Sequence, residues 1–192
     1  MSKTEKRSLT TREMAYIALF AIIIAICSWA SVPGPVPFTM QTFAIFLSVG
    51  LLGGKRGTMA VAVYLLMGVF GLPVFAGFTG GIGRLLGATG GYIVGFLFSA
   101  LIMWAMEKAF GRSGKVLLLS MVMGLLVCYA LGTAWFVLVY NHVTGPMGWA
   151  SALLICVVPY LVPDAAKIAL AMLVCRRLRG LVRKALDGEE ND

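Results

Sequence analysis

Six apolar runs, joined by short polar connections, constrain the fold of this chain more than any other feature. Apolar residues make up 60% of the 192 residues and charged residues only 12%, whereas a soluble domain is about half apolar and about a quarter charged. A helix needs about 20 apolar residues to cross a bilayer core. We therefore predict an all-α, polytopic membrane protein that forms one domain over residues 1–192, a bundle of six transmembrane helices. The runs cover approximately residues 14–31, 39–52, 58–70, 90–106, 116–140 and 150–175, of which the second is short for a span.

Positive charges fall in alternate connections between these runs. Fourteen of the sixteen Lys and Arg residues lie there, and the opposite connections hold only Arg84 and His142. Because cytoplasmic connections carry the excess of Lys and Arg, we predict a multi-pass protein of the cell membrane with residues 1–12 and 176–192 as cytoplasmic tails. Nucleic-acid binding is not indicated by the net charge of +8, since no basic face with interleaved aromatic residues is present. The fourteen cations are Lys3, Lys6, Arg7, Arg12, Lys55, Arg56, Lys108, Arg112, Lys115, Arg176, Arg177, Arg179, Arg183 and Lys184.

A glycine-rich segment separates the third apolar run from the fourth. Seven glycines fall within the fifteen residues 77–91, and Arg84 is the one charge among them. Glycine lets the backbone approach a ligand or another segment closely. Irregular backbone at membrane depth is tolerated only where protein buries it or a cavity wets it. We therefore predict an external, tightly folded loop between helices 3 and 4 that forms part of a binding site.

Asp164 and Lys167 lie within the sixth apolar run and are the strongest candidates for function. A charge at the centre of a membrane span costs about 2.5 to 3.5 kcal/mol, so two charges in one turn need a reason. Their i, i+3 spacing places them on one helix face. Pro159 and Pro163 interrupt the run just before them, and Pro163 is expected to begin a restarted half-helix.

Two interpretations of this pair remain open from the residues alone. The two charges could satisfy each other and merely fix the fold. Alternatively, the carboxylate accepts N–H groups of a small polar ligand while the ammonium meets its acidic group. Arg84 could supply a second cation at the cavity or serve as an interfacial anchor. Three aromatic residues of the fifth run could form an interfacial belt or wall a ligand pocket; these are Tyr129, Trp135 and Tyr140.

Enzyme chemistry is not indicated. GLLGGKR and GRSGK lack the spacing of a phosphate-binding loop, and GGIGRLLG lacks that of a dinucleotide-binding turn. No paired acids, His–Cys set or metal-binding cluster is present, so no metal or cofactor is predicted. Any transport of a substrate against its concentration gradient must draw its energy from a source other than this chain. The alternative to a binding component is a proton- or cation-coupled carrier that uses Asp164 as its titrating group.

Small residues recur on one face of the first apolar run. Ala18, Ala21 and Ala25 are spaced so that another helix can approach closely. That helix could belong to this chain or to a partner protein, and spacing does not separate the two.

Four segments stand out in order along the chain: PVPFTMQTF, YLLMGVFGLPVFAGFTGGIG, LLGATGGYIVGF and PDAAK. Together they resemble the BioY family, the biotin-specific substrate-binding component of energy-coupling factor (ECF) transporters. The resemblance runs from about residue 10 to 179. It implies six helices, with biotin held near the external face by loops 1 and 3 and by helices 4 to 6. It also implies partners, namely a membrane coupling subunit and two cytoplasmic ATPases that use ATP.

The same resemblance assigns roles to individual residues. Asp164 would bind the ureido group of biotin and Lys167 its carboxylate. Ala21 and Ala25, with Ala18 beside them, would face the coupling subunit. The remaining residues expected at the substrate site are Gly80, Gly81, Arg84, Thr89, Gly90, Gly91, Tyr92 and Gln41.

Overall fold

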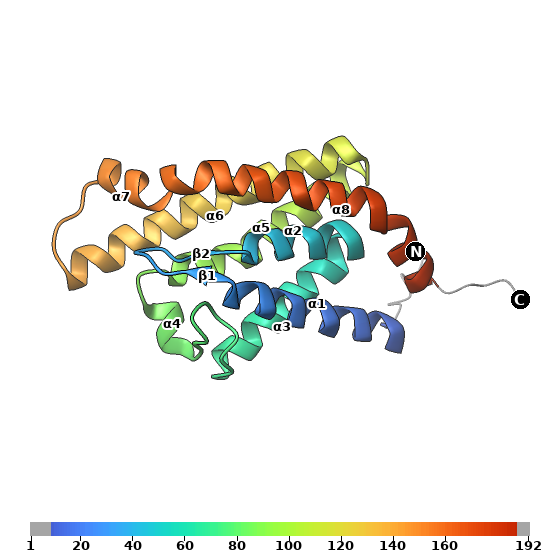
Figure 1. The fold of residues 1–192 in the computed structure, drawn as a ribbon, viewed down its shortest axis with the longest axis horizontal. Coiled ribbons are helices and arrows are strands. Elements are labelled where there is room, and N and C mark those ends of the chain that lie inside the picture. Colours follow the sequence, from blue (N-terminus) through green and yellow to red (C-terminus); the bar gives the residue numbers. More distant parts are fainter. Residues whose placement is uncertain (1–8, 188–192) are drawn as a thin grey trace, which may run out of the picture.

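The computed structural model describes residues 9–187, and these residues are mostly helical. Figure 1 shows long helices lying side by side in one bundle, with one short hairpin at an end. In chain order the elements are α1 (Thr11–Trp29), β1 (Ser31–Val32), β2 (Phe38–Thr39), α2 (Gln41–Leu52), α3 (Gly54–Val69), α4 (Ile82–Leu86), α5 (Gly90–Phe110), α6 (Gly114–Val143), α7 (Trp149–Cys156), a 3-10 turn η1 (Val158–Tyr160) and α8 (Leu161–Asp187).

The membrane character of the chain follows from the longest of these helices. In residues 9–187, four helical stretches are long and apolar enough to cross a bilayer: 11–29, 90–110, 114–143 and 149–186. The second predicted span, α2, has only 12 residues. The third, α3, has 16 residues and begins with Lys55 and Arg56 in its first turn. The predicted all-α membrane protein is confirmed, and the crossing of the bilayer by all six runs stays a prediction.

Three local features differ from the sequence-based expectation. The proline-rich connection after α1 forms an antiparallel hairpin, in which Ser31 pairs with Thr39. The sixth run is interrupted as predicted, but α8 begins at Leu161, before the proline expected to start it. Pro163 lies in the first helical turn, where the missing N–H has no intrahelical partner to lose. The predicted C-terminal tail is helical through Asp187, so α8 extends well beyond the apolar run.

Charged residues gather at one end of the bundle. Figure 1 places the first turn of α1 beside the last turns of α8, and the Arg12 side chain donates to the carbonyl of Ala185 at 3.3 Å. Arg56 pairs with Glu13 across α1 and α3. The prediction also places three further cations at this basic end of the bundle, but they lie outside the described residues: Lys3, Lys6 and Arg7. The hairpin, α4 and α7 occupy the opposite end.

The alanine face of α1 turns out to pack inside the chain. Ala21 and Ala25 are 0% and 3% exposed, and α1 lies against α3. Their small side chains allow close packing within the bundle, and the predicted docking of a partner on these two alanines stays a prediction. Ala18 is exposed on the outer face of α1, so its role as a partner contact stays a prediction.

Candidate functional site

A cavity lies at the end of the bundle opposite the basic end. It encloses about 720 Å³ not filled by protein atoms, part of it open to the outside. Its walls come from the hairpin, α2, the glycine-rich segment, α5, α6, the α7–η1 region and the start of α8. Pockets that bind small molecules place a few polar groups in a mostly apolar wall. Segments far apart in sequence thus converge on one cavity.

Asp164 and Lys167 meet at the wall of this cavity. The Lys167 Nζ lies 2.8 Å from Asp164 Oδ1, and the two residues are 6% and 3% exposed. The pair forms because both residues lie in the first two turns of α8 with an i, i+3 separation. Both line the cavity, so the predicted juxtaposition is confirmed.

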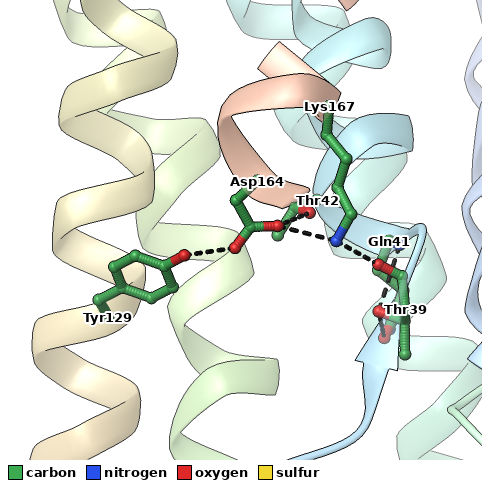
Figure 2. A network of polar contacts seen from close by, with 6 residues as sticks. All are labelled: Thr39, Gln41, Thr42, Tyr129, Asp164 and Lys167. Atoms are coloured by element: carbon green, nitrogen blue, oxygen red, sulfur yellow. Dashed lines mark hydrogen bonds and ion pairs between the residues drawn. The ribbon is translucent and has the colours of Figure 1, made fainter. Parts of the chain in front are cut away.

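Neighbouring elements supply further hydrogen bonds to the pair (Figure 2). Tyr129 of α6 donates its hydroxyl to Asp164 Oδ2 at 2.5 Å, and Thr42 of α2 donates to Oδ1 at 3.3 Å. Lys167 donates to the carbonyl of Thr39 at 2.6 Å, and its Nζ lies 4.0 Å from the ring centroid of Phe38. Buried charges are tolerated when they are paired and hydrogen-bonded. The surrounding elements therefore fix both charged side chains in position at the cavity wall.

Arg84 enters the cavity from the glycine-rich segment. Its Nε donates to the Thr79 hydroxyl at 2.9 Å, which ties α4 back to the loop that precedes it. Arg84, Asp164 and Lys167 are the only charged residues among those that line the cavity. Their charges sum to +1, which suits a ligand with one negative charge.

Thr89, Tyr92 and Gln41, three other predicted site residues, also line the cavity. The Tyr92 hydroxyl is 2.9 Å from that of Thr133, which fixes its phenol against α6. Gln41 is the first residue of α2, and its amide is bonded on both sides by buried hydroxyls. Five of the predicted residues, together with Arg84, are thus brought together in one place.

Sequence comparison identifies the family. The model of the BioY family matches residues 1–184. The chain belongs to the BioY family. It is 38% identical over 173 residues to a protein of Pyrococcus horikoshii described as a probable biotin transporter BioY, covering 90% of this chain and 99% of that one. It is 40% identical over 171 residues to the biotin transporter BioY of Thermotoga maritima, covering 88% and 97%.

A solved structure has the same fold as this BioY-family chain. It is described as the crystal structure at 2.1 Å of the S-component for biotin from an ECF-type ABC transporter. The TM-score is 0.80 and the sequence identity 26%, with 90% of this chain and 95% of that chain covered.

Four glycines predicted at the substrate site do not line the cavity of this BioY-family chain: Gly80, Gly81, Gly90 and Gly91. They serve close packing or backbone turns instead. A Cβ on Gly90 would lie 1.6 Å from the Leu85 carbonyl oxygen, and one on Gly91 would lie 2.2 Å from Trp135 Cβ. A Cβ on Gly80 would lie 2.2 Å from the carbonyl oxygen of Leu72, while Gly81 has φ +89°. Their glycine identity reflects how tightly the loop folds around the site.

Replacing Gly91 with alanine is expected to separate α5 from α6, because the new methyl group meets the side chain and backbone of α6. Overpacking of this kind costs about 1 to 3 kcal/mol, so the thermal midpoint of unfolding in detergent should fall. Gly83 lies in α4 with open space around it, and Gly83→Ala is the matched control with no expected fall. Equal midpoints for the two variants would contradict the packing role of Gly91.

Sequence reasoning missed several polar residues of the site. The sequence has no feature that marks Thr39 and Thr42 as site residues, although both lie in the PFTMQTF segment of the family resemblance. The sequence does not decide between an interfacial belt and a pocket wall for Tyr129, and the structure places it in the wall. Trp135 is 36% exposed, donates to the Gly87 carbonyl at 2.9 Å and does not line the cavity. Tyr140 stacks on Phe136 and also lies outside the lining.

Proposed function

We propose that this chain is the biotin-binding S component of an ECF-type transporter, which captures biotin outside the cell and delivers it inward when coupled to its partners. The observation that carries the proposal is the buried Asp164–Lys167 pair at the wall of a cavity with a net charge of +1. Biotin is a monoanion at neutral pH with a polar ureido ring at its other end. The descriptions of the relatives and of the solved S-component support the same ligand.

The pair has hydrogen-bonding capacity left for a ligand. An ammonium has three donors, and Lys167 uses two of them on Asp164 and Thr39. A carboxylate has about four acceptor sites, and Asp164 uses three for Lys167, Thr42 and Tyr129. A ureido group offers N–H donors beside a carbonyl acceptor. It therefore complements both remaining positions at once, with Asp164 accepting an N–H and Lys167 donating to the carbonyl.

This contact geometry changes the role expected for Lys167. In biotin, the thiophane ring and the valerate chain separate the ureido group from the carboxylate. One extended ligand cannot place its two ends on two groups that lie 2.8 Å apart. We therefore assign both Asp164 and Lys167 to the ureido end. Arg84 approaches the cavity from another segment and is assigned to the carboxylate, because guanidinium groups bind carboxylates well.

The opposite end of the molecule provides the orientation. Arg12, Arg56 and Arg112 lie at the basic end of the bundle, which we place in the cytoplasm by the positive-inside rule. The cavity then opens to the outside. A membrane coupling subunit and two cytoplasmic ATPases supply the energy for release, since this chain has no phosphate-binding loop of its own. The chain itself acts as a binding component and not as an enzyme.

The carrier alternative is less well supported than the binding component. It requires Asp164 to gain and lose a proton during transport, yet this carboxylate is fixed by an ammonium and two hydroxyl groups. The relatives are described as biotin transporters and the fold neighbour as an S-component. Proton-dependent biotin uptake into liposomes that contain this chain alone would favour the carrier.

Titration calorimetry of the detergent-purified chain with biotin tests the proposal, and no binding at micromolar ligand would contradict it. Arg84→Gln should weaken the binding of biotin by about tenfold, which corresponds to the loss of one charge-assisted hydrogen bond. The same variant should bind biotin methyl ester almost as tightly as the unaltered chain does, because the ester has no carboxylate. Arg12→Gln removes a cation at the other end of the bundle and should bind both ligands normally. An equal loss for acid and ester would contradict the assignment of Arg84.

A further inference from the structure

We propose that Tyr64, which does not line the cavity, is a positioning residue of the ligand site. It holds the Gln41 amide so that one amide N–H points at the ligand oxygen that Lys167 also binds. The inference rests on the proposed binding of biotin, whose ureido carbonyl is that oxygen. Tyr64 lies in α3 and is 0% exposed, so it can reach a ligand only through another residue.

Two hydroxyl groups clamp the Gln41 side chain. The amide Nε2 donates to the Tyr64 hydroxyl oxygen at 2.6 Å, and the Thr39 hydroxyl donates to Oε1 at 2.9 Å. The Thr39 hydroxyl oxygen also accepts from the backbone N–H of Gln41 at 3.3 Å. Gln41 is 4% exposed and lies on the cavity wall. The amide plane is therefore fixed from both sides, and the residue that fixes the nitrogen is Tyr64.

The amide nitrogen has one hydrogen to spare. A primary amide has two N–H donors, and Tyr64 is the one acceptor that Nε2 contacts among residues 9–187. The Lys167 ammonium donates to the carbonyl of Thr39, so it lies beside the same residue that holds the Gln41 oxygen. Figure 2 shows Lys167 and Gln41 approaching Thr39 together. Both side chains contact Thr39 and line the cavity, and we assign both donors to one ligand carbonyl oxygen, which has two lone pairs.

The ring of Tyr64 has a separate contact that makes a clean test possible. It packs edge-on against Phe75 of the glycine-rich segment, with centroids 5.7 Å apart. Phe75 in turn lies against Gly68, where a Cβ would come within 2.0 Å of its ring. Phe75 lines the cavity, so the aromatic contact supports a second wall of the site. Phenylalanine at position 64 keeps this ring contact and removes only the hydroxyl group.

A double-mutant cycle tests the inference by calorimetry with biotin. Tyr64→Phe and Gln41→Ala should each weaken binding by about tenfold, as expected for one buried hydrogen bond. The double variant should bind no more weakly than Gln41→Ala alone, because Tyr64 acts through Gln41. Tyr16→Phe, a partly buried tyrosine of α1, is the matched control and should bind biotin as the unaltered chain does. Thermal midpoints of all variants establish that the losses do not come from unfolding.

A ligand analogue gives a second readout. Iminobiotin has an imino nitrogen in place of the ureido oxygen, so the unaltered chain should prefer biotin and Tyr64→Phe should narrow that preference by about tenfold. Additive losses in the double variant, or an unchanged preference, would overturn the positioning role while leaving the proposed function intact. If the unaltered chain does not bind biotin at all, the proposed function and this inference fall together.

Discussion

Replacing Asp164 with asparagine is expected to weaken biotin binding by about a hundredfold or more. The carboxylate accepts from Lys167, Thr42 and Tyr129 and has a site left for the ligand. An amide has one acceptor oxygen, and its NH2 group would face donors of the site. Each hydrogen bond to a charged group contributes about 1.5 to 3 kcal/mol, and an unsatisfied buried donor adds a further penalty. Several such contacts change at once, so the loss should exceed that of any other single site substitution considered above.

Calorimetry and a matched carboxylate check this expectation. Glu107 pairs with Arg112 at the basic end of the bundle, and Glu107→Gln removes the same charge far from the cavity. Biotin binding by that variant should equal that of the unaltered chain. If Asp164→Asn also bound biotin normally, the ligand would have to contact other residues, and the proposed site would be wrong.

The site could be located from sequence because its charges are anomalous. Asp164 and Lys167 interrupt an apolar run, and their spacing already requires a shared helix face. Glycines at 77–91 likewise indicate irregular backbone, and that segment does contribute to the cavity wall through Arg84. Both signals depend on residue types that are costly or unusual in their setting. The structure confirms that they meet.

The finer contacts had no comparable signal. Thr42 and Tyr129 are residue types found on many apolar helices, and only the packing of α2, α6 and α8 reveals that they face Asp164. Thr39 lies in the hairpin, and only the fold brings its carbonyl to Lys167. A glycine does stand out in the sequence, but its role is ambiguous. Gly91 permits the close approach of α5 to α6, and the sequence does not separate that role from contact with a ligand.

The alanines of α1 illustrate the same limit. Ala21 and Ala25 are suited to any close helix contact, whether inside the chain or with a partner. Their burial against the rest of the bundle depends on the rotation of α1 about its own axis. That rotation is set by tertiary packing, for example by Ile24 and Phe20, which are also buried.

Replacing Lys167 with methionine is expected to destabilise the chain by about 3 to 5 kcal/mol, because it leaves Asp164 buried without its counter-charge. Methionine has a similar length and an apolar end, so it leaves no large void. The thermal midpoint of unfolding in detergent should therefore fall clearly. Lys115→Met, an exposed lysine in the first turn of α6, is the control for loss of a positive charge and should unfold near the unaltered midpoint.

The double variant Asp164→Asn with Lys167→Met separates stability from binding. Removing both charges eliminates the uncompensated carboxylate, and replacing a buried ion pair by neutral groups is often close to neutral for stability. The double variant should reverse most of the fall in the thermal midpoint of unfolding that Lys167→Met causes, while it still fails to bind biotin. A self-satisfied pair that only fixes the fold predicts a different result, in which ligand binding returns together with stability. If Lys167→Met were as stable as the unaltered chain, Asp164 would have to be hydrated through the cavity, and the pair would not be desolvated as its burial implies.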